Sequence, residues 1–112
     1  MNDLNNFMAT KLMGWKNAGD WFNEGIDYLM GYGTDSLFTG MKLADWKPDS
    51  DLNQALMCAD KFGEWAINKD DGYWYAVGRD GVMISGVVDT IEELPKAICE
   101  VIMESIENEE NK

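Results

Sequence analysis

The sequence lacks histidine altogether and contains only two cysteines, two prolines and nine basic residues. Without histidine, the chain lacks the side chain that most often transfers protons near neutral pH. Two cysteines and no histidine also cannot supply the four ligands of a structural zinc site. No apolar run is long enough to span a membrane, and the start, MNDLNNFMATK, has neither the basic residues nor the apolar core of a signal peptide.

Basic residues are scarce relative to the 21 acidic ones, which gives a net charge of −12. Such a field repels nucleic acid and anionic membranes, so we expect the chain to bind neither. Two interpretations of the charge remain open: it serves solubility, or it imitates nucleic acid and blocks a DNA-binding protein. Part of the charge belongs to the C-terminal region, where residues 107–112 form an acidic tail.

The 112 residues, 46% hydrophobic and 27% charged, are typical of one globular domain, 1–112. Cys58 and Cys99 lie within helical patterns. We therefore expect reduced core cysteines of a cytosolic protein, with a disulfide between them as the alternative.

Apolar spacing predicts helices over 3–13, over 51–62 and from Pro95 onward. Asp51 and Gln54 are spaced as a capping box, and Ile91–Leu94 is predicted to be a lead-in turn. Three strands are predicted at 64–68, 73–79 and 82–88, with turns at 69–72 and Asp80-Gly81. Both faces of the middle strand are apolar, which indicates a covered sheet. The pattern predicts an α+β fold with an antiparallel sheet between helical layers, an α/β/α sandwich.

Residues 16–45 differ from the rest because they hold five of the eleven glycines and many aromatic residues. Two short strands are predicted, at Trp21–Phe22 and Ile26–Met30, joined by a turn at 23–25. The remainder of this Gly/aromatic-rich insert is predicted to be irregular, and long irregular loops in compact domains are often functional.

Four short motifs resemble small proteins of tailed bacteriophages that are grouped as the phage ABA sandwich domain family. They are "LMGW" (12–15), "WKPDSDLNQA" (46–55), "YWYAVGRDG" (73–81) and "DTIEELPKAIC" (89–99). The resemblance covers most of the chain except 16–42. It implies an α/β/α sandwich and a phage or prophage origin, and it implies no reaction. Any special function of this member is therefore expected in the insert.

The sequence shows no enzyme signature, cofactor motif or metal site. "GYGTDS" (31–36) lacks the lysine of a P-loop and the spacing of a dinucleotide fingerprint. "DWKPDSD" (45–51) lacks the central glycine and final glutamate of an EF-hand loop, so a turn with capping acids is the favoured interpretation.

Aromatic side chains are the stronger functional signal, with five tryptophans and four tyrosines. Aromatic rings stack on nucleobases, and a phosphate would need donors such as Lys16, Lys42 or the amides near Ser50. The alternative is that these rings pack in the core or form an oligomer interface. The candidate ligand-binding residues are Trp15, Trp21, Tyr28, Tyr32, Trp46, Lys47 and Arg79.

Two functions of different classes follow as hypotheses. The first is a phage anti-defence protein, forming a homo-oligomer in the cytoplasm of the infected bacterial host. It would sequester a nucleotide-derived immune messenger of the cyclic ADP-ribose type without catalysis. The second is an acidic protein–protein inhibitor, a nucleic-acid mimic that blocks a host defence protein. An enzyme that cleaves a messenger ranks third, because it would need metal-bound carboxylates and no convincing cluster occurs.

Overall fold

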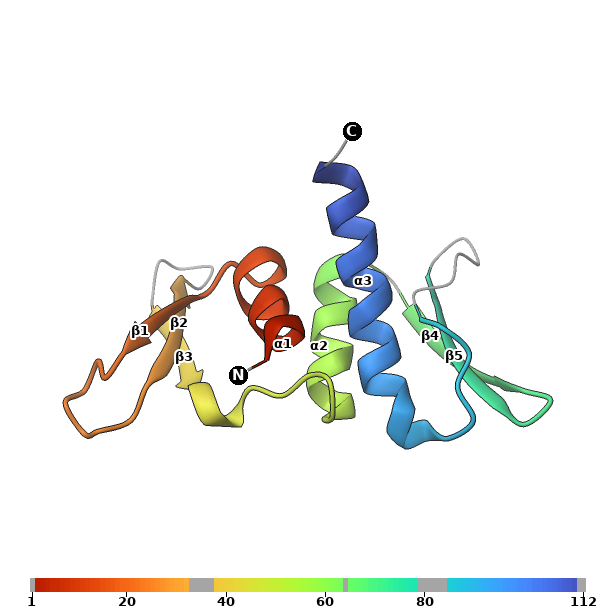
Figure 1. Ribbon diagram of the computed structural model, residues 1–112, viewed down its shortest axis with the longest axis horizontal. Helices are drawn as coiled ribbons and strands as arrows, with labels where there is room; N and C mark the ends of the chain where they lie inside the picture. Colours follow the sequence, from red (N-terminus) through yellow and green to blue (C-terminus); the bar gives the residue numbers. More distant parts are fainter. Residues whose placement is uncertain (1, 33–37, 64, 79–84, 111–112) are drawn as a thin grey trace.

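The computed structural model describes residues 2–32, 38–63, 65–78 and 85–110. Three α-helices lie in the middle of the molecule, and one small antiparallel sheet lies on either side of them (Figure 1). The molecule is elongated, with extents of 50 × 31 × 26 Å. The helices are α1 (Asp3–Phe7), α2 (Leu52–Phe62) and α3 (Leu94–Glu110). The strands are β1 (Lys16–Gly19), β2 (Tyr28–Tyr32), β3 (Phe38–Lys42), β4 (Trp65–Asp70) and β5 (Tyr73–Gly78).

The predicted α+β class with antiparallel pairing is confirmed, with the strands divided between two sheets. The strands form two sheets, β1-β2-β3 and β4-β5, and the helices occupy the space between them (Figure 1). The sheet β4-β5 packs only one face on the helices, because Ala76 is fully buried while Tyr73 is 47% exposed. The apolar character of both faces of β5 therefore does not mean that both are covered, since tyrosine can leave part of its ring in solvent.

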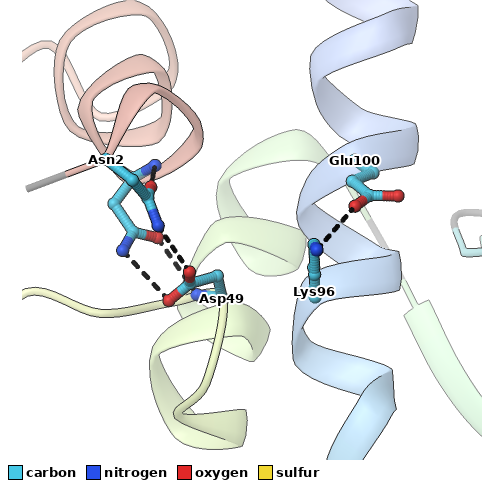
Figure 2. Close-up of polar contacts among 5 residues, drawn as sticks. Asn2, Asp49, Lys96 and Glu100 are labelled. Carbon is cyan, nitrogen blue, oxygen red and sulfur yellow. Dashed lines mark hydrogen bonds and ion pairs between the residues drawn. The ribbon is translucent and has the colours of Figure 1, made fainter.

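The first helix begins where the sequence predicts. The side chain of Asn2 caps it by accepting from the Asn5 N–H at 2.8 Å, and a π-helical turn, Met8–Leu12, continues it to Gly14 at φ +74°. Both asparagines also donate to the Asp49 carboxylate, Asn2 at 2.7 Å and Asn5 at 3.0 Å, and the Asp49 N–H donates back to Asn5 (Figure 2). This network fixes the start of α1 against the loop that precedes α2.

The starts of α2 and α3 explain much of the turn chemistry in the sequence. Asp51 caps α2 by accepting from the Gln54 N–H at 3.1 Å. The Gln54 side chain does not complete a capping box; it accepts from the Lys47 N–H and donates to the Asp45 carbonyl. A 3₁₀ turn, Ile91–Glu93, leads into α3 as predicted, and Thr90 and Glu93 form its capping box.

The sheet β1-β2-β3 corrects the prediction for the insert. Trp21 and Phe22 do not form a strand; they lie exposed in the loop between β1 and β2. The predicted strand Ile26–Met30 overlaps β2, while β1 and β3 were not predicted. The Lys-Asn-Ala-Gly sequence of β1 has no apolar alternation, so only pairing with β2 makes it a strand.

The hairpin β4-β5 is confirmed, with Asp71 and Gly72 both at positive φ as a two-residue turn requires. The predicted third strand, 82–88, falls partly on residues outside the described ranges, as does the Asp80-Gly81 turn. Its described part meets β5 through a single Trp74–Val88 bridge. Ser85 adds a side-chain contact, since its hydroxyl accepts from the Ala76 N–H at 2.7 Å. A hydroxyl thus replaces a backbone partner at this position.

The core lies between the helices and receives side chains from both sheets. Its buried members include Met8, Leu29, Ala76, Leu94 and Ile98. Cys58 and Cys99 are buried free thiols, as predicted. The neighbouring Cys58 thiol, together with burial, raises the pKa of Cys99, whose Sγ donates to the Pro48 carbonyl. Within the described ranges, no helix has the length and apolar character of a membrane span.

Candidate functional site

A hollow of about 270 Å³ opens on the sheet β1-β2-β3, inside the predicted Gly/aromatic-rich insert. Strand β1, the middle of β2 and the side chain of Trp21 line it. The described lining residues are Gly14, Lys16, Asn17, Ala18, Trp21, Met30 and Gly31. Such hollows with an aromatic ring and a few polar groups are typical of small-molecule sites.

Strand register shows which side chains share a face of this sheet. Lys16 lies opposite Met30, and Lys42 lies opposite Tyr28, so all four side chains project to one side of the sheet. Leu29 lies on the other side and is fully buried in the core. The outer-face residues Lys16 and Met30 therefore line the hollow together with Asn17, which lies opposite Leu29 and so belongs to the inner face. Two of the nine basic residues, Lys16 and Lys42, lie on the outer face.

The loop between β1 and β2 is held by one carboxylate. Asp20 accepts from the backbone N–H groups of Glu24 and Gly25, each at 2.8 Å, and of Ile26 at 3.4 Å. These hydrogen bonds to the ionised form lower the pKa of Asp20. The loop also brings the Phe22 ring edge-on to Tyr28, with 5.0 Å between centroids. Asp20 thus holds together the loop on which Trp21 lies.

Trp15 packs on strand β2 at Gly31, and Trp46 packs on Trp15. A Cβ added at Gly31 would overlap the Trp15 ring and lie 3.1 Å from its Nε1, so the indole packs directly on the backbone of β2. Trp15 meets Trp46 edge-on, with 4.9 Å between centroids. Trp46 is 2% exposed and donates its indole N–H to the Asn5 carbonyl at 2.8 Å. Neither ring lines the hollow.

The structure therefore distributes the predicted site residues among different environments. Trp21 lines the hollow, and Tyr28 lies on the same sheet face. Trp46 is corrected to a core residue: its buried ring has no accessible face for a ligand, because Asn5 and Trp15 cover it. Lys47 is exposed in the loop before α2 and does not line the hollow. Arg79 and the side chain of Tyr32 lie outside the described residues.

The lining also contains residues that the sequence interpretation missed. Lys16 was considered only as a phosphate donor and Gly31 only as part of "GYGTDS", while Asn17, Ala18 and Met30 were not considered as ligand-binding residues. Their contribution depends on the pairing of β1 with β2, for which the sequence carries no periodic signal. The close approach of Trp15 explains the glycine at 31, which a sequence pattern alone cannot interpret.

The chemistry of the hollow suits binding. The seven described lining residues offer an ammonium group, a carboxamide and an indole, and they include no carboxylate or thiol. Among the residues that the structure describes, no three Cys, Asp or Glu side chains gather closely enough to hold a metal ion. No protein family model, curated protein or solved structure matches the chain. The phage resemblance therefore stays a prediction from the motifs.

Proposed function

We propose that this chain is a phage anti-defence protein that binds and sequesters a nucleotide-derived immune messenger, without catalysis, in the cytoplasm of the infected host. The observation that carries the proposal is the hollow on the sheet β1-β2-β3, where Trp21 and Lys16 line the same space. An indole and an ammonium group are complementary to the two ends of a nucleotide, its base and its phosphate.

Trp21 supplies the surface for the base. It is 58% exposed, and the Asp20 hydrogen bonds hold the loop on which it lies. Stacking of a base on an aromatic side chain contributes about 1 to 3 kcal/mol. Asn17 also lines the hollow; its side-chain oxygen accepts from the Gly19 N–H at 2.9 Å, and its amide NH2 can donate to a base edge or a ribose hydroxyl.

Lys16 supplies the charge for a phosphate, and Lys42 lies on the same face two strands away. In a chain of net charge −12, a local pair of cations is what an anionic ligand requires. The volume of about 270 Å³ is near the lower end of small-molecule pockets, roughly 300 Å³. One nucleoside portion fits the hollow, and the pyrophosphate of a cyclic ADP-ribose type messenger would extend along the lysine-bearing face.

Native mass spectrometry tests the proposal directly. The purified protein is measured alone and after incubation with lysate of phage-challenged cells that carry a messenger-producing defence. We expect an added mass in the nucleotide range and a homo-oligomeric protein. In Trp21→Leu the ligand-bound fraction should fall at least tenfold, while Tyr73→Leu, which removes an exposed aromatic ring from the other sheet, should leave it unchanged. Unchanged protein mass in every lysate would overturn the proposal.

The acidic protein–protein inhibitor is the second candidate, and the exposed face of α3 favours it. Glu100, Glu104 and Glu107 follow one another at helical spacing and are all exposed. Such a row of carboxylates can take the place of phosphates before a basic protein. This candidate predicts a complex from host lysate that contains a basic protein and dissociates as salt is raised. A pull-down without such a protein would count against it.

A further inference from the structure

A second hollow, of about 410 Å³, lies on the other sheet and is separate from the proposed messenger site. Its described lining residues are Asp70, Asp71, Tyr73, Tyr75 and Val87. Four of them come from the hairpin, from the end of β4 to Tyr75 in β5, and Val87 comes from the segment that meets β5 at Val88. The two hollows lie at opposite ends of the molecule, because the helices separate the sheets (Figure 1).

The register of the hairpin places this hollow on the outer face. Asp70 lies opposite Tyr73, and Tyr75 follows two residues later, so the three side chains project to one side. Trp74 and the fully buried Ala76 project to the other side, toward the helices. The ammonium group of Lys69 lies 5.2 Å from the centre of the Trp74 ring, which is on that inner side. Lys69, near the end of β4, therefore does not occupy the outer hollow.

The outer hollow combines two aromatic rings with two carboxylates. Side chains two residues apart on a strand are about 7 Å apart, which leaves space for an ammonium group between the rings of Tyr73 and Tyr75. The face of an aromatic ring attracts cations, and the carboxylates of Asp70 and Asp71 add their charge. The five described lining residues include no cationic side chain that could compete, and the net charge of −12 raises the local concentration of cations.

The rings also decide what kind of cation fits. Calcium needs six to eight oxygen ligands, and two carboxylates with two phenols do not supply them. Ring faces and the Val87 methyl groups are instead complementary to the methyl or methylene groups around an organic ammonium ion. The geometry points to a binding site for a small organic cation, of the methylated ammonium class, on the outer face of β4-β5.

Choline is the probe, because a neutral molecule of the same shape exists. In 3,3-dimethyl-1-butanol, carbon replaces the charged nitrogen, so the difference in affinity measures the charge-dependent part of binding. We follow amide chemical shifts of the intact chain during titration with each compound. We expect choline to shift Tyr73, Tyr75 and Val87 and to bind at least tenfold more tightly than the alcohol. Equal affinities, or no shift at these residues at high choline concentration, would overturn the site.

Variants distinguish a local site from general attraction to an acidic protein. Tyr73→Leu removes a half-exposed ring, and Asp71→Asn keeps a residue that tolerates the φ of +50° at this turn position. Each should weaken choline binding at least threefold. Glu107→Gln removes the same charge from α3 and should leave the affinity unchanged. If Glu107→Gln weakens choline as much as Asp71→Asn does, the attraction is non-specific and the proposal fails.

Discussion

The two sheets flank the same helices and are both small and antiparallel, yet their outer faces have opposite chemistry. The face of β1-β2-β3 carries Lys16 and Lys42, and Lys16 lines the hollow together with Trp21. The face of β4-β5 carries Asp70, Asp71 and two tyrosines. A net charge of −12 therefore describes the face of β4-β5 in sign but not the lysine-bearing face of β1-β2-β3. For a small ligand, the positions of a few charges on one sheet face matter more than the total charge of the chain.

The sheets also differ in how they are attached to the core. Trp15 and Trp46 connect β1-β2-β3 to the first helix, with the Trp46 indole bound to the Asn5 carbonyl. The sheet β4-β5 is attached by the fully buried Ala76, with Trp65 and Ile67 of β4 packed against the same core, and the Ala76 N–H donates to the Ser85 hydroxyl. Changes at these attachment points should affect one sheet and spare the other.

The largest effect is expected for Trp46→Ala. Removing a large buried aromatic side chain costs about 3 to 5 kcal/mol, and the Asn5 carbonyl loses its donor as well. Chemical denaturation should show this loss, and hydrogen exchange should accelerate in β2 more than in β5. Trp46→Phe, which retains a ring but not the N–H, should lose less. Equal acceleration in both sheets would contradict the proposed role of Trp46 as the attachment of one sheet.

A smaller loss of stability is expected for Gly31→Ala. The added Cβ would overlap Trp15, and overpacking of this kind costs about 1 to 3 kcal/mol. Displacement of Trp15 should also reduce ligand binding at the hollow of about 270 Å³, because Gly31 lines that hollow. Gly86→Ala is the matched control, because nothing lies within 4 Å of a Cβ built there. Thermal unfolding that is equally lowered by both substitutions would show that Trp15 does not restrict position 31.

A loss of stability confined to the sheet β4-β5 is expected for Ser85→Ala. The substitution leaves the N–H of the buried Ala76 without its acceptor, which should cost about 1 to 2 kcal/mol. Hydrogen exchange should accelerate at Ala76 and Val88 while β2 stays protected. Ser85→Thr keeps a hydroxyl and is the rescue variant. Unchanged exchange at Ala76 in Ser85→Ala would mean that the hydroxyl contributes nothing to β4-β5.

The smallest effect on stability is expected at Asp20, which is fully exposed. Asp20→Asn should shift the amide resonances of Glu24 and Gly25 and weaken ligand binding through Trp21, with little change in melting temperature. Because hydrogen bonds lower the pKa of Asp20 from 3.8, the loop contacts are present above that pH. They should be lost only as the pH falls through the lower, folded-state pKa. Loss of the contacts already near pH 5 would contradict this assignment.

Local signals in the sequence predicted the elements that local physics controls. Apolar spacing predicted α2 and the first helix, and the turn predicted at 69–72 indicated the hairpin β4-β5, whose turn is formed by Asp71 and Gly72. The predicted strand at Trp21–Phe22 was wrong, because it relied on the general preference of aromatic residues for strands. Here the Asp20 hydrogen bonds form a loop instead. The pairing partners of β1 and β3 could not be found from their own residues.

The candidate site shows the same division. Composition alone marked residues 16–45 as the unusual part of the chain, and the hollow lies there. The sequence could not separate Trp21, which lines the hollow, from Trp46 in the core, since each is a single tryptophan that follows an aspartate. Only tertiary structure decided this, because burial depends on which distant residues arrive. Asn5 covers Trp46, while register brings Lys16 opposite Met30 beside Trp21. The sequence by itself determined the class of fold, the helix ends and the hairpin turn, because each depends on neighbours within a few residues.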